Sequence, residues 1–434
     1  MLQAACIVAK AILAPQTEHV KIYSPVDLKP AYKQTEVGVI PEEWGVKPLG
    51  ECASFRTGPF GSALHKSDYA DDGIPVVNPM HINEGRIEPT RTMTITEKAA
   101  KALSDFRMKA GEIVIGRRGD MGRCAVVQPE QAGWLCGTGS MIIRCGATDA
   151  GFLQRVLSSP RAIAAIEDTS VGSTMINLNQ GTLAGLRLQF PPLPEQRAIA
   201  TALSDVDGLL GGLDRFIAKK RNLKKAAMQQ LLTGQTRLPG FHGEWEVKRL
   251  GDVFTISAGK SKSTFIAENG DFWICDMGSV SAEGRLIVSK RTNHRCDFLR
   301  KGDLIMPKDD IGGGNIIGKV GYIDANETYI LGDHVYCLRA LEGDSRFLAF
   351  TINSHRVNSE LRKKVIGSAQ LGLGRKSVTE QKIQIPSTPE QTAIAEVLRE
   401  MDGELAMLEH RREKTRALKQ AMMQELLTGR IRLL

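Results

Sequence analysis

The sequence contains few aromatic residues and no long apolar run, and both absences limit what the chain can be. Aromatic side chains make up 5% of its 434 residues, and the apolar fraction of 42% is ordinary for a water-soluble globular protein. No stretch approaches the roughly 18 apolar residues of a transmembrane helix, so no membrane span is expected. A chain of this length predicts two or three domains, each able to bury a core.

The eight cysteines are scattered without a CxxC pair, which argues against a disulfide framework or a zinc finger. They are expected to be reduced, buried thiols of a cytoplasmic protein. Residues 2–15 are mildly apolar, but they lack a basic leader and are interrupted by Lys10, which favours a short helix or a disordered tail over a signal peptide. His294 and Cys296 lie close together, but no second pair completes a metal site.

Recognisable catalytic groups are also missing. Residues 190–193 only faintly resemble an amino-methyltransferase motif, because Phe190 cannot bond the target amine and Leu193 cannot stack on a base. A nuclease site needs clustered acids beside a lysine, and Glu246 and Lys248 have no acidic partner at a plausible spacing.

One glycine-rich segment imitates a nucleotide site. Residues 313–320 match a phosphate-binding loop through Lys319, but Val320 stands where Ser or Thr would hold magnesium, and no helical pattern follows. The chain is therefore predicted to be non-catalytic, with no metal and no cofactor of its own.

The dominant feature that is present is an internal duplication. Residues 194–238 and 389–433 align without a gap, and about half of their positions are identical. Apolar residues follow a heptad spacing in both copies: Ile199, Leu203, Val206, Leu210, Leu213 and Ile217 in the first, and Ile394, Leu398, Met401, Leu405 and Leu408 in the second.

Each copy also carries helix-end signals. Pro194 and Pro389 suit a first helical position, and Gly234 and Gly429 follow the last periodic leucines. Each copy is therefore predicted to form one helix of about 55 Å. Such a long apolar stripe needs a partner, and we expect the two copies to pair as an antiparallel coiled coil. The alternative is two unrelated helices, each packed on its own domain.

The duplication extends beyond the helices, because residues 40–51 and 241–252 share Glu-Trp, Val-Lys and Leu-Gly followed by an acid. Between these openings and the helices, short β-rich runs and helical segments alternate with glycine-rich turns. Strands are expected at 113–115, 125–127, 141–143, 304–306, 319–323 and 335–338, and helices at 152–166 and 347–365. The predicted fold class is α+β: two mixed α/β domains and two long helices.

A net charge of +8 and a pI near 9.0 favour a polyanionic partner. Glycine-rich loops carry basic residues at 56–66, 116–123 and 137–140, and comparable loops occur at 257–264 and 308–319. Glycine lets the backbone approach a partner, and Arg and Lys bind phosphates or guanine, although any one loop could be an ordinary solvated turn. Candidate DNA contacts are Arg56, Ser62, Lys66, Arg117, Arg118, Arg123, Lys260, Lys262, Lys308 and Lys319, with Arg117, Arg118 and Lys308 foremost.

The order of these motifs resembles the specificity subunit of type I restriction–modification systems over nearly the whole chain. The matching segments are Pro-Pro-Leu-Pro-Glu-Gln-Arg-x-Ile-Ala at 191–200, Pro-Glu-Gln-x-x-Ile-Ala at 389–395, Met-Gln-x-Leu-Leu-Thr-Gly at 228–234 and 423–429, and Ile-Pro-x-x-Trp-x-Val-x-x-Leu-Gly at 40–50. An N-terminal extension of roughly 35 residues departs from the family pattern.

The resemblance implies two target-recognition domains, each recognising half of an asymmetric, bipartite site in double-stranded DNA. The helices would then act as a spacer and as a docking surface for two methyltransferase subunits, which restriction and translocase subunits join. S-adenosylmethionine, ATP and Mg²⁺ would belong to those partners. Candidate spacer and partner residues are Glu195, Gln196, Ile199, Leu203, Leu210, Glu390, Gln391, Ile394, Leu398 and Leu405.

The corresponding division is an N-terminal arm (1–39), a first target-recognition domain (40–193), a first spacer helix (194–238), a second target-recognition domain (239–388) and a second spacer helix (389–434). Three alternatives remain open at this point. The chain could be a stand-alone DNA-binding regulator with two unlike domains, a specificity chain serving a fused methyltransferase–nuclease, or a coiled-coil adaptor without a nucleic-acid partner.

Overall fold

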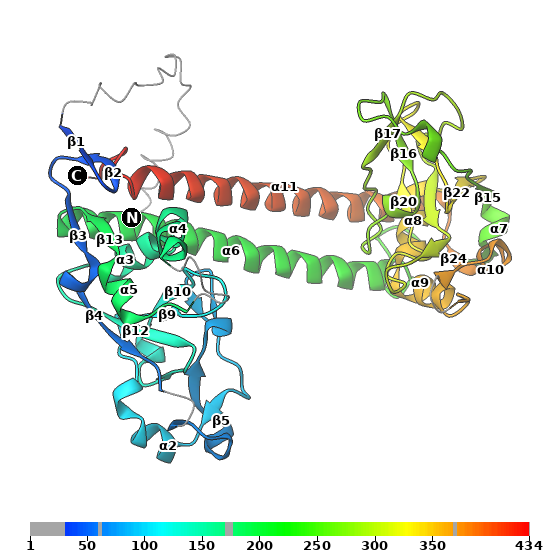
Figure 1. Cartoon of the computed structure of the whole chain (residues 1–434). Coiled ribbons are helices and arrows are strands. Elements are labelled where there is room, and N and C mark those ends of the chain that lie inside the picture. The colour runs from blue at the N-terminus through cyan, green and yellow to red at the C-terminus, as the bar shows by residue number, and fades with distance from the viewer. Residues whose placement is uncertain (1–30, 60–62, 170–176, 368–370, 434) are drawn as a thin grey trace. The chain divides into compact units, whose positions relative to one another are not determined.

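The computed structural model describes residues 31–59, 63–169, 177–367 and 371–433, and within them it leaves out the side chain of Lys66. The chain divides into two compact units, of which unit 1 comprises Met1–Leu213 with Arg411–Leu434 and unit 2 comprises Asp214–His410. Two 39-residue helices, α6 (Leu193–Leu231) and α11 (Thr388–Leu426), each contribute a part to both units (Figure 1). The predicted domain boundaries therefore stay predictions.

Unit 1 is built on an antiparallel sheet with the strand order β10 (Cys124–Val126), β9 (Ile113–Gly116), β12 (Ser140–Cys145) and β4 (Ala53–Thr57). A second sheet has the order β11 (Leu135–Cys136), β5 (Tyr69–Val77) and β8 (Thr94–Ile95), with β11 parallel to β5. Paired strands complete it: β1 (Tyr32–Thr35) with β2 (Gly38–Pro41), β3 (Gly45–Pro48) with β13 (Arg187–Phe190), and β6 (Ile82–Asn83) with β7 (Arg86–Ile87).

Unit 2 repeats this topology. Its larger sheet has the order β15 (Phe254–Ala258), β22 (Val335–Ala340), β18 (Leu304–Pro307) and β20 (Gly321–Tyr322), and its smaller sheet has β17 (Lys290–Thr292), β16 (Phe272–Cys275) and β21 (Tyr329–Leu331), with β21 parallel to β16. The pairs are β14 (Glu246–Arg249) with β24 (Lys382–Ile385), and β19 (Asp309–Asp310) with β23 (Leu371–Gly372). The same strand order in both units confirms that the duplication covers the globular parts.

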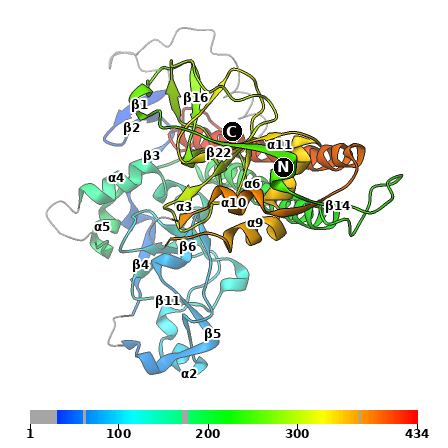
Figure 2. The ribbon, with the colours of Figure 1, turned by 90° about the vertical axis from the view of Figure 1, so that its right-hand side faces the viewer.

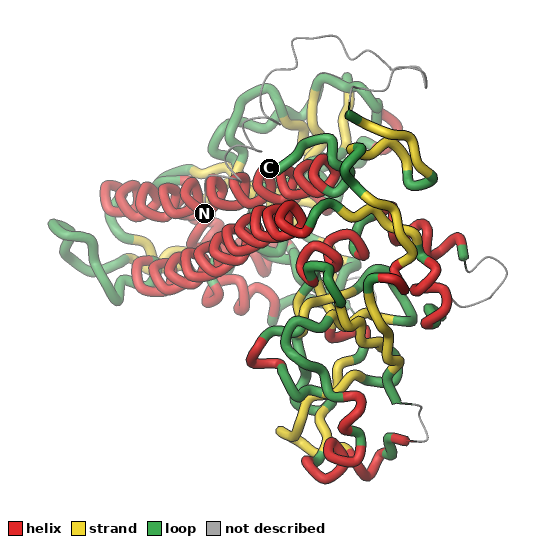
Figure 3. The backbone as a smooth tube through the Cα atoms, turned by 90° about the vertical axis from the view of Figure 1, so that its left-hand side faces the viewer, coloured by secondary structure: helices red, strands yellow, loops and turns green. Residues whose placement is uncertain are grey.

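Short helices lie between these strands, as Figure 3 shows by colour. In unit 2, β16 and β22 lie on one side of α9 and α10 (Figure 2). The helices of unit 1 are α2 (Glu97–Ala102), α3 (Ala150–Leu157), α4 (Pro160–Asp168) and α5 (Gln180–Gly185). Those of unit 2 are α7 (Leu250–Val253), α8 (Ser345–Asn353), α9 (His355–Arg362) and α10 (Arg375–Thr379). The α+β class is confirmed.

Two predicted helices are each split in the structure. The segment predicted at 152–166 forms α3 and α4, because Pro160 cannot continue a helix and the Ser159 hydroxyl accepts the Ala162 N–H to start a new one. The segment predicted at 347–365 breaks in the same way, where the Ser354 hydroxyl accepts the Val357 N–H and caps α9. In both units a capping serine, rather than the apolar period, sets the break.

Smaller differences concern element ends. The strand expected at 319–323 is reduced to β20, and the helix expected at 194–238 ends at Leu231. Gly234 has a positive φ of 70°, which ends the helical geometry three residues later. The part of the expected N-terminal arm that the structure describes includes the β1–β2 hairpin, whereas residues 1–30 and the tail expected there lie outside the described residues.

Both units bury a core that includes parts of both long helices. In unit 1, Ile199 and Leu203 of α6 and Met422 and Leu426 of α11 join one cluster with Phe152. The equivalent cluster of unit 2 contains Leu231, Phe347, Ile394 and Leu398, among others. In each unit, the globular part is therefore packed against segments of both long helices.

Ion pairs fix the direction of the helices within each unit. In unit 1 the Lys419 ammonium lies 2.6 Å from the Asp207 carboxylate. The corresponding pairs of unit 2 are Lys220 with Glu404 at 2.5 Å and Lys224 with Asp402 at 2.6 Å. Residue numbers rise along α6 as they fall along α11, so the paired segments of unit 2 run antiparallel, as predicted.

Two glycine substitutions test how closely unit 1 is packed around Gly208 of α6 and around Gly58, which follows β4. Gly208→Ala in α6 should stabilise unit 1 by about 0.5–1 kcal/mol, because an added Cβ meets nothing within 4 Å and alanine favours the helix. Gly58→Ala should destabilise it by roughly 2 kcal/mol, because the Cβ would stand 1.9 Å from the Gly137 carbonyl oxygen. Hydrogen exchange measured on unit 1 peptides reports both changes, and a Gly58→Ala protein as protected as the wild type would contradict the close approach.

Candidate nucleic-acid interface

Three glycine-rich loops of unit 1 meet where β4 and β9 end and β12 begins. The Gly58 N–H donates to the Ser140 carbonyl at 3.0 Å, and the Arg117 N–H donates to the Gly139 carbonyl at 2.9 Å. A side chain on Gly58 would collide with the carbonyl of Gly137, so the two backbones can approach only because both residues are small. The structure thus brings together the three loops of the first domain that the sequence indicated. We call them the unit 1 loop cluster.

A fourth segment, which the sequence analysis did not single out, joins this cluster. Asn78 precedes the 3₁₀ turn η4 (Pro79–His81), and its side-chain oxygen accepts the Gly139 N–H at 3.4 Å. Met80, in the same turn, exposes 63% of its surface. A single methionine between a proline and a histidine gives no sequence signal that separates a surface loop from a core position.

Arg117 and Arg118 occupy this cluster differently. The Arg117 Nε–H donates to the Leu178 carbonyl at 2.8 Å, and partial burial, together with the charge of Arg118, lowers the pKa of Arg117. Arg118 is exposed and has no hydrogen-bond or ion-pair partner among the described residues. Arg117 is therefore anchored to the fold, while the side chain of Arg118 is free to meet a partner.

The remaining unit 1 candidates are less available. The Arg56 guanidinium pairs with Asp105 at 2.9 Å and lies 4.8 Å from the centre of the Phe106 ring. Arg123 pairs with Asp120. Lys66 begins the turn η3 (Lys66–Asp68), but its side chain lies outside the described part of the structure, as does all of Ser62.

Unit 2 contains an equivalent cluster, which we call the unit 2 loop cluster. A Cβ on Gly259 would stand 1.7 Å from the Gly332 carbonyl oxygen, which repeats the contact between Gly58 and Gly137. The Lys308 N–H donates to the His334 carbonyl at 2.9 Å and so joins the loop after β18 to the loop before β22. The loops at 257–264 and 308–319 therefore both pack on the loop at 332–335, which the sequence analysis did not single out.

Four lysines of this cluster were candidates, and two of them already have internal partners. The Lys262 ammonium is 8% exposed and lies 2.6 Å from Asp297, and this hydrogen bond raises the pKa of Lys262. Lys319 donates to the Asn353 carbonyl at 2.9 Å, and burial lowers its pKa. Lys260 is exposed and Lys308 half-buried, and within the described ranges neither ammonium has a partner.

A basic and aromatic edge of unit 2 was missed by the sequence analysis. The Arg291 guanidinium lies 3.9 Å from the centre of the Trp273 ring, and the rings of Phe265 and His294 stack with centres 4.0 Å apart. The basic run at 290–295 was visible in the sequence. The aromatic partners, which lie 18 to 29 residues earlier, were not linked to it by any spacing rule.

The helix residues that were candidates for spacer and partner contacts are mostly internal. Glu195 is 2% exposed, and its carboxylate binds the Arg432 guanidinium at 2.6 Å and the Trp44 indole N–H at 3.0 Å. In unit 2 the Glu390 carboxylate, 1% exposed, binds Arg237 at 2.5 Å. We call each arrangement a glutamate clamp. Hydrogen bonds to the buried carboxylate raise the pKa of both arginines.

The glutamine that follows each of these glutamates makes two hydrogen bonds, and these are equivalent in the two units. The Gln196 side chain accepts the Asp149 N–H at 2.9 Å and donates to the Pro191 carbonyl at 2.9 Å. Gln391 accepts the Asp344 N–H at 3.0 Å and donates to the Pro386 carbonyl at 2.9 Å. The Pro-Glu-Gln motif therefore attaches the start of each long helix to its own globular part.

The apolar candidates on the helices also lie inside the units. Ile199, Leu203, Ile394, Leu398 and Leu405 are buried, and Leu210 is half-buried against the core of unit 1. These side chains stabilise the fold and do not form an open docking surface.

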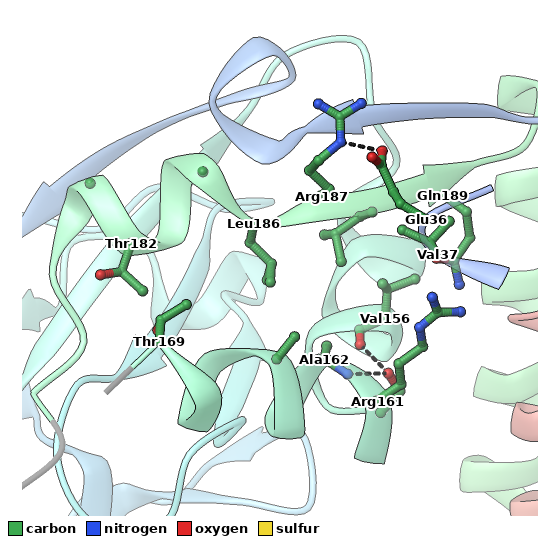
Figure 4. Close-up of a pocket in the computed structure, with 15 residues that line it drawn as sticks. Glu36, Val37, Val156, Arg161, Ala162, Thr169, Thr182, Leu186, Arg187 and Gln189 are labelled. Atoms are coloured by element: carbon green, nitrogen blue, oxygen red, sulfur yellow. Dashed lines mark hydrogen bonds and ion pairs between the residues drawn. The ribbon is translucent and has the colours of Figure 1, made fainter. Parts of the chain in front are cut away.

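A pocket of about 450 Å³ lies beside α4, α5 and β13 of unit 1 (Figure 4). Its wall includes Val37, Val156 and Leu188, and the ion pair between Arg187 and Glu36 lies at its edge. None of the candidate DNA-contacting residues lines it. It is therefore separate from the loop cluster.

No helix among the described residues is both long and apolar enough to cross a membrane. In the same residues, no group of three or more His, Cys, Asp or Glu side chains is placed to hold a metal ion.

Comparison with known proteins identifies the class. A sequence profile described as the type I restriction modification DNA specificity domain matches residues 41–214 and again residues 242–416. The chain is 24% identical over 418 residues to the type I restriction enzyme MjaVIII specificity subunit of Methanocaldococcus jannaschii, covering 91% of this chain and 94% of that one. The putative MjaX specificity subunit of the same organism is 23% identical over 424 residues, covering 92% and 96%.

Solved structures support the fold. The S subunit of a type I restriction–modification system from M. genitalium superposes with a TM-score of 0.59 at 17% identity, covering 92% of this chain and 99% of that one. A chain from a structural study of type I R-M complex assembly and conformational transition gives a TM-score of 0.53 at 17% identity, covering 90% and 99%.

The fold is that of a duplicated protein with two related globular parts and two long helices. With both parts matched by its profile, the chain belongs to the type I restriction–modification DNA specificity family. The resemblance found in the sequence is thereby confirmed.

The glutamate clamp of unit 1 can be tested by a double-mutant cycle. Arg432→Met should destabilise unit 1 by roughly 2 kcal/mol, because the buried Glu195 carboxylate keeps its charge but loses its guanidinium partner. Adding Glu195→Gln should restore most of that loss. The matched control is Arg430→Met, which removes a more exposed pair with Glu425 and should have little effect.

Hydrogen exchange of unit 1 is measured for the wild type, the Arg432→Met and Glu195→Gln single variants, the double variant and the Arg430→Met control. Equal destabilisation by Arg432→Met and Arg430→Met would contradict a buried clamp.

Proposed function

We propose that this chain is the DNA-recognition subunit of a type I restriction–modification complex, and that each globular domain recognises one half of a bipartite, asymmetric site in double-stranded DNA. The observation that carries this proposal is the double match to a DNA specificity domain, at residues 41–214 and 242–416. The relatives that match most of the chain are named specificity subunits, which agrees with it.

The loop clusters support DNA as the partner. Each one gathers glycine-rich backbone and basic side chains at one end of a sheet, with Arg118 free in unit 1 and Lys260 and Lys308 free in unit 2, as far as the described residues extend. Such side chains bind phosphates and base edges. Close backbone packing fixes the position of the loops that carry them. We infer that these clusters face the DNA.

The two clusters differ in their side chains, which supports an asymmetric site. Unit 1 presents Arg118 and Met80, whereas unit 2 presents Lys260, Lys308 and the exposed Ile311. Two copies of one fold with unlike side chains would contact unlike base pairs. The two halves of the site should therefore have different sequences.

For the long helices we propose the role of a spacer and of a docking surface for two methyltransferase subunits, which restriction and translocase subunits join. In this proposal the chain itself is non-catalytic. S-adenosylmethionine, ATP and Mg²⁺ would act in the partner subunits.

The first test is a domain exchange. Replacing residues 40–193 with the corresponding domain of another family member should change one half of the selected site and leave the other half unaltered. The measurement is sequencing of duplexes selected from a randomised library by the complex that co-purifies with the chain. The reciprocal exchange of residues 239–388 is the control and should change only the other half.

Two outcomes would contradict the proposal. Changes in both halves after one exchange would mean that the domains do not act separately. Tight, selective binding by the isolated chain without any co-purifying subunit would favour a stand-alone two-domain DNA-binding regulator.

The spacer role has its own test. Matched insertions of one heptad in α6 and in α11 add about 10 Å at 1.5 Å per residue, and should lengthen the unspecified spacer by about three base pairs at 3.4 Å each. A seven-residue glycine–serine insertion between Gly240 and Gly243, outside the helices, is the control and should leave the spacer unchanged. An unaltered spacer after the matched insertions would rule out the helices as its determinant.

A further inference from the structure

A short β-ribbon begins directly after Lys308 of the unit 2 loop cluster. Asp309 and Asp310 of β19 pair with Gly372 and Leu371 of β23. On the other edge of β23, Ile366 exchanges two backbone hydrogen bonds with Gly372, at 2.9 and 2.8 Å. We call residues 309–311, 366 and 371–372 the unit 2 ribbon.

The base of the ribbon is held firmly by hydrogen bonds. The Leu373 N–H donates to the Lys308 carbonyl at 2.7 Å, and the Tyr336 hydroxyl donates to the Leu373 carbonyl at 3.1 Å. The buried Asp310 carboxylate accepts the N–H groups of Gly312 at 2.6 Å and Ile316 at 3.0 Å. The ribbon is therefore a preformed element, and ordering it on binding would cost little.

Two isoleucines of the ribbon are turned to solvent. Ile311 exposes 68% and Ile366 exposes 78% of its surface. Single exposed apolar residues are common on protein surfaces, but here two such residues belong to one short ribbon, and the described residues leave both uncovered. A partner that covered both would gain the free energy of burying them.

The surroundings of these isoleucines are basic. Lys308, Arg362, Lys363 and Arg375 have no hydrogen-bonding or ion-pairing side-chain partner anywhere in the described ranges. The ribbon's own acids are already engaged, since Asp310 is buried and the Asp309 carboxylate lies 2.6 Å from the His334 ring nitrogen. The charge of this surface therefore favours a polyanion.

Two exposed isoleucines beside a two-stranded ribbon, with flanking cations, match the major groove of duplex DNA. That groove admits a two-stranded β-ribbon, and each thymine presents a C5-methyl group on its floor. Phosphates along both edges of the groove lie within reach of lysine and arginine side chains.

We propose that the unit 2 ribbon enters the major groove of its half-site and that Ile311 and Ile366 contact thymine methyl groups. Lys308, Arg362 and Arg375 contact the phosphates beside them. The inference rests on the proposed function, in which unit 2 recognises DNA, and it adds the base type and the residues that recognise it.

The test replaces single thymines of the unit 2 half-site by uracil, which lacks only the methyl group. The half-site is the one defined by exchange of residues 239–388, and the protein is the full chain in its co-purifying complex. At each contacted position the wild-type complex should bind the uracil duplex about fourfold more weakly, as expected for one methyl group. Ile311→Ala and Ile366→Ala should bind more weakly and should no longer distinguish thymine from uracil at their own positions.

Leu341→Ala is the matched control, because Leu341 follows β22 in the same unit and is 64% exposed. It should keep both the affinity and the preference for thymine. The proposal is overturned if the wild-type complex is indifferent to every uracil replacement, if both isoleucine variants keep the thymine preference, or if the half-site has no A·T pair. Absence of any sequence-selective binding by the wild type would instead contradict the proposed function.

The phosphate contacts have a separate readout. Lys308→Ala, Arg362→Ala and Arg375→Ala should each reduce the slope of log affinity against log salt concentration by about 0.9. Lys382→Ala, which removes an exposed lysine on β24, is the charge-matched control and should leave the slope unchanged. Unchanged slopes in all three variants would mean that these residues do not contact phosphates.

Discussion

The structure depends on a buried carboxylate at the start of each long helix. Glu195 and Glu390 are almost fully removed from solvent, and a buried charge of this kind is tolerated only beside a well-placed partner. In each case the partner is an arginine that follows the end of the other long helix: Arg432 for Glu195 and Arg237 for Glu390. Neither unit can be completed by one helix alone, so sequence segments 237 residues apart in unit 1 and 153 residues apart in unit 2 must fold together.

Much of the fold could be predicted because its signals are local and repeated. Heptad spacing and the Pro-Glu-Gln starts predicted both long helices, and the duplicated Trp-containing openings predicted two related globular parts. The strands at 113–115, 141–143 and 335–338 formed close to their expected positions. The helix breaks at Ser159 and Ser354 were missed because the apolar period continues across them, although a serine before a proline at Pro160 was a readable signal.

The candidate site could be predicted as a set of loops but not side chain by side chain. Glycine-rich loops indicated where backbone could approach a partner. In unit 1 these loops contact one another, and in unit 2 both predicted loops pack on the loop at 332–335. Whether a given cation is free depends on acids far away in the sequence: Lys262 pairs with Asp297 and Arg56 with Asp105, contacts that no local pattern announces. Exposed residues such as Ile366 were missed for the opposite reason, since an apolar residue in a short β-rich run is ordinarily a core residue.

Because of the glycine contacts at Gly58 and Gly259, the backbone shape of each loop and the side chains that it presents can change independently. At these two glycines main-chain atoms touch main-chain atoms, so this part of the loop geometry does not rely on the identity of neighbouring side chains. Side chains a few residues away, such as Arg118 or Lys260, can then be exchanged without refolding the loop that carries them. A scaffold of this kind is evolvable: new sequence preferences can arise by point substitution, one domain at a time, while the framework that presents them stays intact.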